Sequence, residues 1–153
     1  MKQKRLWAAV LLLAALLAAC AQVPTVSLPV EEDGTEPAEG GEGLSILFLD
    51  VGQADSMLLR CGDDAMLVDG GNVGDSNTVA AVLGKQEGLD RLEYVVCTHA
   101  HEDHGGGIPG ALHTLPADHL LAPVDTCDSR YFQNLLKAAA EQDLAIEIPA
   151  PGD

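Results

Sequence analysis

The sequence predicts a layered α+β domain over residues 44–153, and two observations lead to this fold class. The segment opens with three short apolar runs separated by turn residues, which is the pattern of an antiparallel meander. It continues with apolar runs that alternate with stretches of helical periodicity, which is typical of helices packed against a sheet. A chain of 153 residues has room for one such domain.

Three strands are predicted first, at 44–49, 56–61 and 65–69, because each is a run of apolar residues of strand length. Residues 50–53, Asp-Val-Gly-Gln, form the turn between the first two strands. Residues 62–64, Gly-Asp-Asp, form a tight hairpin between the second and third strands.

The second part of the segment alternates helices and strands. After a loop at 70–74, Asp75 or Ser76 is expected to cap a helix that runs to about Leu83, with Gly84 or Gly88 ending it. The other predicted elements are a strand at 92–97, a short helix at 108–114, a strand at 119–122, a helix at 129–142 and a strand at 144–148.

Residues 1–19 are predicted to be a bacterial lipoprotein signal peptide. Basic residues precede an apolar stretch at 6–17, which is too short for a committed membrane span. The small residues before Cys20 resemble a lipobox, which implies cleavage before Cys20 and lipidation of its thiol. We therefore expect an extracytoplasmic protein that its lipid anchors to the bacterial cell membrane; an ordinary signal peptide with a chance cysteine is the alternative.

Acidic residues dominate the chain after this leader. Residues 20–43 are rich in Glu, Gly and Pro and are predicted to form a flexible tether between the lipid and the domain. The whole chain has a net charge of −16, and removing the leader's three basic residues, Lys2, Lys4 and Arg5, lowers it to −19. This charge argues against tight, unassisted binding to a phosphate backbone.

The three cysteines that follow Cys20 predict no complete disulfide framework, because their number is odd. Cys61 and Cys97 fall in predicted strands and are interpreted as small buried hydrophobic residues. An oxidising exterior still leaves one bridge open among Cys61, Cys97 and Cys127. None of them has the spacing of a cysteine-based zinc site.

Three histidines and two acidic residues fall within 99–104, directly after the predicted strand at 92–97. Burial of unpaired polar groups is costly, so packing alone does not explain this composition. Imidazole and carboxylate ligands together suit zinc or a similar borderline cation. The sequence therefore predicts a metal site in this cluster.

The expected arrangement is a site for two cations. In an extended segment, His99 and His101 point the same way and can hold one cation, while Asp103 and His104 face a second one. Two neighbouring divalent cations can activate a water molecule and clamp an attacked carbonyl or phosphorus centre. The glycines at 105–107 would let the backbone approach the metals without a Cβ in the way.

Residues 98–104, Thr-His-Ala-His-Glu-Asp-His, resemble the Thr-His-x-His-x-Asp-His motif of the metallo-β-lactamase superfamily at every fixed position. The resemblance implies an αββα sandwich and two divalent metal ions, zinc first, with manganese or iron as the alternatives. It implies that His99 and His101 bind the first metal and that Asp103 and His104 bind the second. Asp103 would also orient the nucleophile, which makes it the candidate catalytic residue.

The resemblance also implies a role for one residue outside this cluster. Residues 68–71, Val-Asp-Gly-Gly, resemble an earlier acidic motif of the family, in which the aspartate braces the histidine loop. Asp69 is therefore expected to support the site by hydrogen bonds rather than to bind a metal. His113 and His119 match no motif and are expected to be surface or capping residues, and residues 129–131 are given no role.

Residues 48–56, Phe-Leu-Asp-Val-Gly-Gln-Ala-Asp-Ser, resemble a narrower group within the superfamily. They are similar to the opening of the extracytoplasmic hydrolase-like domain of ComEC-type DNA-uptake competence proteins, which typically have Gly where this chain has Ala54. The resemblance implies a phosphodiester substrate, such as DNA. It also suggests candidates for lining the metal cleft, although turn chemistry alone favours aspartate in such a loop: Asp50, Gln53 and Asp55.

The resemblance covers residues 44–153 and implies that they form only the first half of the family's domain. A complete site would need a later histidine, a bridging aspartate and a final histidine, and no matching motif follows His104. We expect a truncated fragment of a longer hydrolase, with a natural half-domain of weak metal affinity as the alternative. Such a fragment would be inactive alone and would expose the inner face of its sheet.

Three functions remain open from the sequence. The first is a lipid-anchored, metal-dependent hydrolase of phosphodiesters or DNA, which the negative charge counts against. The second is a hydrolase of the same fold that attacks a carbonyl, such as that of a β-lactam or a lactone. The third is a non-catalytic tethered module, which the intact histidine motif counts against. The membrane and the substrate are the expected partners, and no protein partner is predicted.

Overall fold

The computed structural model describes residues 43–152, so the predicted leader, Cys20 and nearly all of the tether lie outside the described residues. The secondary structure reported below belongs to residues 43–152. In that part of the chain, no helix has both the length and the apolar character needed to cross a membrane.

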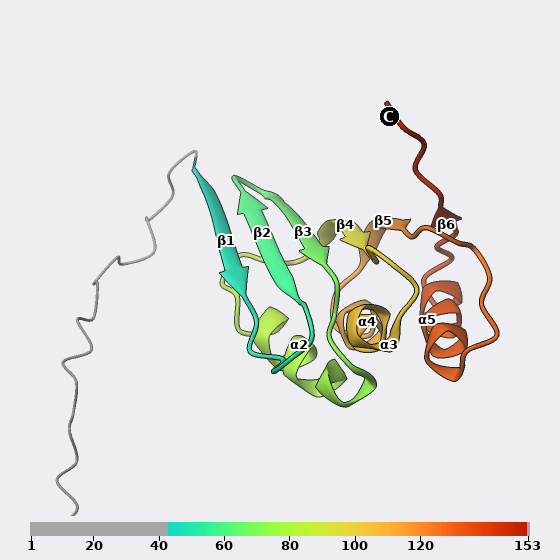
Figure 1. Ribbon diagram of the computed structural model, residues 1–153. Coiled ribbons are helices and arrows are strands. Elements are labelled where there is room, and N and C mark those ends of the chain that lie inside the picture. Colours follow the sequence, from blue (N-terminus) through green and yellow to red (C-terminus); the bar gives the residue numbers. More distant parts are fainter. Residues whose placement is uncertain (1–42, 153) are drawn as a thin grey trace, which may run out of the picture. The chain divides into compact units, whose positions relative to one another are not determined.

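The described residues form one six-stranded sheet in which the strands lie side by side in chain order (Figure 1). The strands β1 to β3 pair antiparallel, and the strands β3 to β6 pair parallel. The strands are β1 (Leu44–Phe48), β2 (Met57–Cys61), β3 (Asp64–Val68), β4 (Leu92–Val96), β5 (Ala117–Leu121) and β6 (Ile146–Glu147).

Helices cover one face of this sheet (Figure 1). They are the 3-10 turn η1 (Val73–Asp75) and the α-helices α2 (Ser76–Leu83), α3 (Glu102–Gly105), α4 (Ile108–Leu112) and α5 (Arg130–Ala140). The α+β fold class predicted from the sequence is confirmed, and Gly84 follows α2 as one of the two predicted stops.

Two strands and one helix differ most from the prediction. The strand β5 begins at Ala117, ahead of the predicted start at His119, because the polar Asp118 within it is paired with Arg91. The strand β6 is limited to two residues. The helix α3 was not predicted, because a single turn of polar residues carries no apolar period.

The hydrophobic core lies between the helices and the covered face of the sheet. Strand register brings Leu58 opposite Leu67, Leu67 opposite Val95, and Val95 opposite Leu120, so these side chains form one row across four strands. All four are at most 1% exposed. The helices contribute the other side of the core through Val79, Leu83, Ile108, Ala111, Leu135, Ala138 and Ala139. Burial of a leucine side chain contributes roughly 1.5–3 kcal/mol, so this row is a main source of stability.

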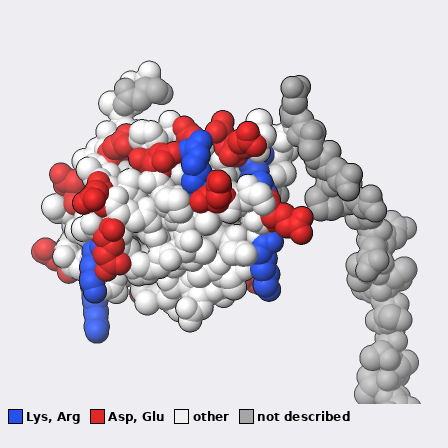
Figure 2. Space-filling view, turned by 180° about the vertical axis from the view of Figure 1, so that it is seen from behind, with Lys and Arg blue, Asp and Glu red and all other residues white. Residues whose placement is uncertain are grey.

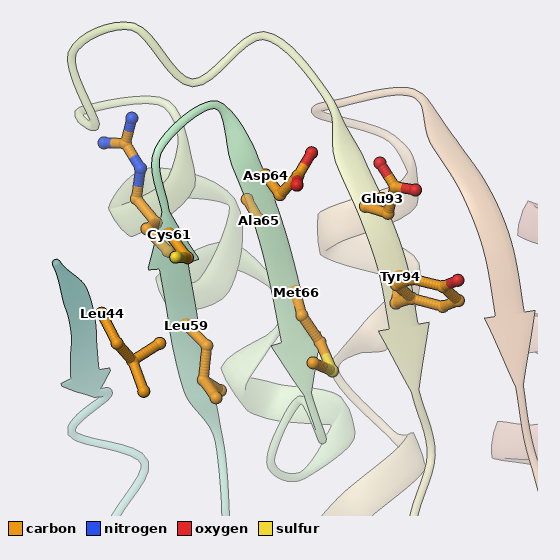
Figure 3. Close-up of a pocket in the computed structure, with 9 residues that line it drawn as sticks. Leu44, Leu59, Cys61, Asp64, Ala65, Met66, Glu93 and Tyr94 are labelled. Atoms are coloured by element: carbon orange, nitrogen blue, oxygen red, sulfur yellow. The ribbon is translucent and has the colours of Figure 1, made fainter. Parts of the chain in front are cut away.

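The opposite face of the sheet carries exposed apolar side chains. Ile46 lies opposite Leu59, Leu59 opposite Met66, and Met66 opposite Tyr94. Phe48 is 72% exposed and Leu44 is 63% exposed. A cavity of about 240 Å³ lies on this face, and Figure 3 shows Leu44, Leu59 and Met66 pointing to its side of the sheet. Such an exposed face is expected for the first half of a sandwich.

The cysteines differ from the prediction at one position. Cys97 is buried, as predicted, and burial with the nearby charge of Asp69 raises the pKa of its thiol to about 11. Cys61 is exposed instead of buried, because it is the last residue of β2 and belongs to the uncovered face (Figure 3). Cys61, Cys97 and Cys127 are all free thiols.

The glycines at 105–107 do not provide room for metals or substrate. A Cβ on Gly107 would overlap the carbonyl oxygen of Gly70, and a Cβ on Gly106 would crowd the backbone nitrogen of Val73. The predicted role is therefore wrong: Gly106 and Gly107 allow the chain after the histidine cluster to pack against the loop after β3, and Gly105 faces Cys97, Tyr131 and Leu135. Gly110 in α4 plays the same part against α2, where a Cβ would overlap the carbonyl oxygen of Ser76.

Replacing Gly110 with alanine is expected to lower the free energy of unfolding by about 1–3 kcal/mol, because α4 and α2 must then move apart. Urea unfolding followed by circular dichroism would measure the change. Gly74→Ala is the matched control, because nothing lies within 4 Å of a Cβ at that position. Equal unfolding midpoints for the two variants would contradict the close approach of α2 and α4.

Candidate metal centre

Asp69 links the third strand to the histidine cluster. It follows β3 directly, is 2% exposed, and has a left-handed backbone with a φ of 57°. Its Oδ1 accepts a hydrogen bond from the backbone nitrogen of Thr98 at 2.8 Å, and its Oδ2 accepts one from Thr98 Oγ1 at 2.7 Å. The same Oδ2 lies 2.8 Å from Nδ1 of His104. Asp69 thus fixes both ends of the segment that contains the histidines.

The contact with Asp69 decides which nitrogen of His104 is available. A carboxylate oxygen only accepts hydrogen bonds, so the Nδ1 of His104 carries the proton that it donates to Asp69. In the neutral ring, Nε2 would then carry the lone pair, as in metal-bound histidines whose other nitrogen is held by a carboxylate. The side chain of His104 is 12% exposed.

Three side chains of the cluster come together. His99, Asp103 and His104 each offer one ligand atom, and these atoms all lie within 4.8 Å of one another. The rings of His99 and His104 are 3.7 Å apart between centroids. All three residues are half-buried. Two imidazoles and a carboxylate form a donor set that fits zinc or a similar divalent cation.

His101 lies beside this group and is exposed. Its ring centroid is 4.7 Å from that of His99, and the two rings meet at 71°. The extended geometry predicted for the cluster is wrong, because β4 ends at Val96, residues 98–101 bend, and α3 begins at Glu102. The ring of His99 therefore lies next to both His104 and His101, on a bend rather than on a strand.

The loop before β2 reaches the same place. The Oδ2 of Asp55 lies 3.7 Å from the Nε2 of His104, and the Oδ2 of Asp103 lies 3.9 Å from it. The backbone nitrogen of Asp55 donates to the carbonyl of Asp103 at 3.3 Å. Asp50 and Gln53, the other two candidates of this loop, are exposed.

Tyr131 is a contact of the site that the sequence analysis missed. Its hydroxyl, from the first turn of α5, donates to the backbone carbonyl of Ala100 inside the histidine segment. A Cβ on Gly105 would lie 3.6 Å from its ring, so tyrosine and glycine are in close contact. The helical period of α5 explains an aromatic residue at this position by packing alone, so the sequence carried no signal for this bond.

The remaining polar residues lie outside the cluster. His113 is 3.1 Å from Glu141, and His119 is 2.7 Å from Glu147, which raises the pKa of His119 by a hydrogen bond. Both histidines are at the surface, as predicted. Cys127 shares a hydrogen bond with Ser129 ahead of α5, and this bond lowers the pKa of its thiol.

A sequence profile of the metallo-β-lactamase superfamily matches residues 49–152, a span that includes Asp69 and the whole histidine cluster. The chain belongs to the metallo-β-lactamase superfamily. Members of this superfamily are metal-dependent hydrolases and typically bind zinc ions. The donor set of His99, Asp103 and His104, together with the free Nε2 of His104, fits such an ion.

Two solved structures are similar to the chain. The short form of human tRNase Z has 21% sequence identity and a TM-score of 0.44, and the match covers 69% of this chain and 46% of that one. The metallo-β-lactamase FIM-1 from Pseudomonas aeruginosa, in its mono-zinc form, has 16% identity and a TM-score of 0.39, and the match covers 74% of this chain and 54% of that one. The chain thus spans about half the length of each of these proteins. No curated protein sequence matches it.

Proposed function

We propose that the chain is the first half of an extracytoplasmic, lipid-anchored hydrolase that uses divalent cations to cleave phosphodiester bonds. The observation that carries the metal chemistry is the placement of His104, whose Nδ1 is held by Asp69 and whose Nε2 lies among His99 and Asp103. The leader and Cys20 support the membrane anchor through the sequence alone.

In this proposal, some residues of the chain bind the cations, and Asp69 positions those residues. His99, His101, Asp103 and His104 would hold two divalent cations, and Asp69 keeps Thr98 and His104 in place through its buried carboxylate. Bound cations of this kind supply Lewis acidity to the attacked centre and lower the pKa of a water. Asp103, whose side chain is 47% exposed, would orient the attacking water.

The substrate class rests on the loop before β2. Residues 48–56 are the segment that resembles ComEC-type competence proteins, and the backbone of Asp55 within it is bonded to Asp103 at the metal centre. The segment that carries the resemblance therefore lies next to the proposed metal ligands. This placement favours a phosphodiester over a carbonyl substrate.

The charge of the surface limits how such a substrate is held. Figure 2 shows acidic side chains gathered along the upper rim of one face, with few basic side chains among them. Arg91, one of the few basic residues of the domain, is already paired with Asp64, Glu93 and Asp118. Attraction of the phosphate then depends on the bound cations rather than on lysine or arginine.

Hydrolysis assays on the full-length protein that contains this chain would test the proposal. The substrates are bis(p-nitrophenyl) phosphate, single-stranded DNA, nitrocefin and a lactone, each with Zn²⁺ or Mn²⁺ and with a chelator control. We expect metal-dependent cleavage of the phosphodiesters and no turnover of nitrocefin or the lactone. Turnover of a carbonyl substrate alone would assign the site to that class of hydrolase. Metal binding without any turnover would favour a non-catalytic module.

A further inference from the structure

We propose that Asp55 is an additional metal ligand, which binds the same cation as His104. The inference rests on the proposed metal-dependent function and adds to it a ligand from outside the histidine motif. Asp55 lies in the loop between β1 and β2, far from the motif in sequence, and its side chain is 65% exposed.

The backbone of Asp55 is held on two sides. Its nitrogen donates to the carbonyl of Asp103 at 3.3 Å, and its carbonyl accepts from the nitrogen of Gly71 at 2.9 Å. The next residue, Ser56, is 4% exposed and its hydroxyl donates to the carbonyl of Asp69 at 3.0 Å. The loop is thus bonded both to the histidine segment and to the segment after β3, so Asp55 has a defined place beside the cluster.

The spacing of the side chains fits a shared cation. Zn–N and Zn–O bonds are about 2.1 Å long, so two atoms bound to one zinc lie at most about 4.2 Å apart. The Oδ2 of Asp55 is 3.7 Å from the Nε2 of His104, and the Oδ2 of Asp103 is 3.9 Å from the same nitrogen. The oxygen of Asp55 is therefore within the limit for a cation that Nε2 also binds, and it lies outside the compact group formed by His99, Asp103 and His104.

A direct hydrogen bond between Asp55 and His104 does not explain this spacing. Hydrogen bonds from nitrogen to a carboxylate oxygen are about 2.7–2.9 Å long when charged groups are involved, well below the observed separation. The hydrogen bond of His104 to Asp69 uses Nδ1, the other nitrogen of the ring. The 3.7 Å between Oδ2 of Asp55 and Nε2 of His104 is too long for a hydrogen bond. It is a distance at which both atoms can bind one ion.

The local charge also favours a cation. The carboxylates of Asp55, Asp69 and Asp103 all lie within 4 Å of His104. Within residues 43–152, the recorded ion pairs of arginine or lysine are those of Arg91, and its partners are Asp64, Glu93 and Asp118. None of these ion pairs involves the three carboxylates near His104. A divalent cation would therefore offset their negative charge.

An added carboxylate ligand changes the preference of the site among metals. Carboxylate oxygens suit harder cations such as Mn²⁺, whereas imidazoles suit Zn²⁺ and Fe²⁺. If Asp55 supplies an oxygen, its loss should weaken the binding of Mn²⁺ more than the binding of Zn²⁺. A larger loss for Mn²⁺ than for Zn²⁺ would therefore show that Asp55 binds the metal. A residue that only shapes the loop would affect both metals alike.

Isothermal titration calorimetry with Mn²⁺ and Zn²⁺ tests the inference. The full-length protein is first freed of metal by chelation and is then titrated with each metal. Asp55→Asn keeps the shape of the side chain but removes its charge, and we expect it to weaken Mn²⁺ binding tenfold or more and Zn²⁺ binding less. Asp63→Asn is the matched control, because Asp63 is an exposed carboxylate in the hairpin at the other end of β3. That control should change either affinity less than twofold. The unfolding midpoint of metal-free Asp55→Asn should equal that of the wild type, because the side chain is exposed.

His104→Ala separates failure of this inference from failure of the proposed function. If His104→Ala loses metal binding while Asp55→Asn binds both metals as the wild type does, Asp55 is not a ligand and the proposed metal centre stands. If Asp55→Asn weakens both metals equally and unfolds earlier, its role is structural and the inference is overturned. If the wild type binds no metal, or His104→Ala binds it unchanged, the proposed metal centre itself is wrong.

Discussion

Asp69→Asn is expected to weaken metal binding about 10–100-fold while leaving the protein folded. The left-handed backbone of Asp69 is a conformation that asparagine tolerates well, so the substitution adds no backbone strain. The asparagine oxygen can keep the bond from the backbone nitrogen of Thr98. Its amide group then takes the place of Oδ2, which faces His104.

The predicted loss comes from a change of tautomer in His104. The amide of asparagine donates a hydrogen bond, so Nδ1 of His104 must accept it instead of donating. The ring proton then moves to Nε2, and the lone pair that faces Asp103 and Asp55 is lost. Metal can bind only after this arrangement is broken, which lowers its affinity without removing a ligand.

Isothermal titration with Zn²⁺, run beside urea unfolding of the metal-free protein, would measure both effects. Asp69→Ala is the comparison variant, because it removes the acceptor of the bonds from Thr98 and from Nδ1 of His104, whose side chain is 12% exposed. A buried donor without a partner costs about 1–3 kcal/mol, so the alanine variant should be less stable than the asparagine variant. Wild-type zinc affinity in Asp69→Asn would show that Asp69 does not control His104.

Asp103→Ala is expected to abolish metal loading and hydrolysis with little change in stability. The side chain of Asp103 is 47% exposed, and its place in the structure is next to Nε2 of His104 rather than in the core. Removal of one of three clustered ligand groups leaves two imidazoles, which bind a divalent cation weakly. His101→Ala should act in the same direction, and its effect on stability should be small because His101 is exposed.

Metal content after equilibration with excess Zn²⁺ and gel filtration, measured by mass spectrometry, would report the loss in each variant. Glu102→Ala is the matched control, because Glu102 is an exposed carboxylate next to Asp103 in α3. Full metal content and full activity in Asp103→Ala would overturn the assignment of this residue. Loss of metal in Glu102→Ala as well would point to general damage to α3.

Most of the sheet could be predicted from the sequence because its strands are short apolar runs bounded by turns. The ends of β1, β2, β3 and β4 fall within one residue of the expected ends. The prediction was weaker where tertiary contacts set the boundary, as in β5, whose polar Asp118 is paired with Arg91. The exposure of Cys61 followed from which face of the sheet the helices cover, and a strand pattern alone does not contain this information.

The residues of the metal centre could be named from a local motif, but their arrangement could not. The bend at 98–101 turns His99 toward His104, and a linear sequence gives no sign of that bend. Asp55 and Tyr131 come from a loop and a helix that only the fold brings to the cluster. The glycines after the cluster stand out in the sequence, but only the fold shows that Gly106 and Gly107 meet the backbone of the loop after β3.

The most direct test is the zinc content of the purified full-length protein, wild type beside His104→Ala. The geometry of His99, Asp103 and His104 predicts bound zinc in the wild type and none in His104→Ala, with the variant still folded by circular dichroism. Equal zinc content in the two proteins, or no zinc in the wild type after equilibration with excess metal, would contradict a metal centre at this cluster.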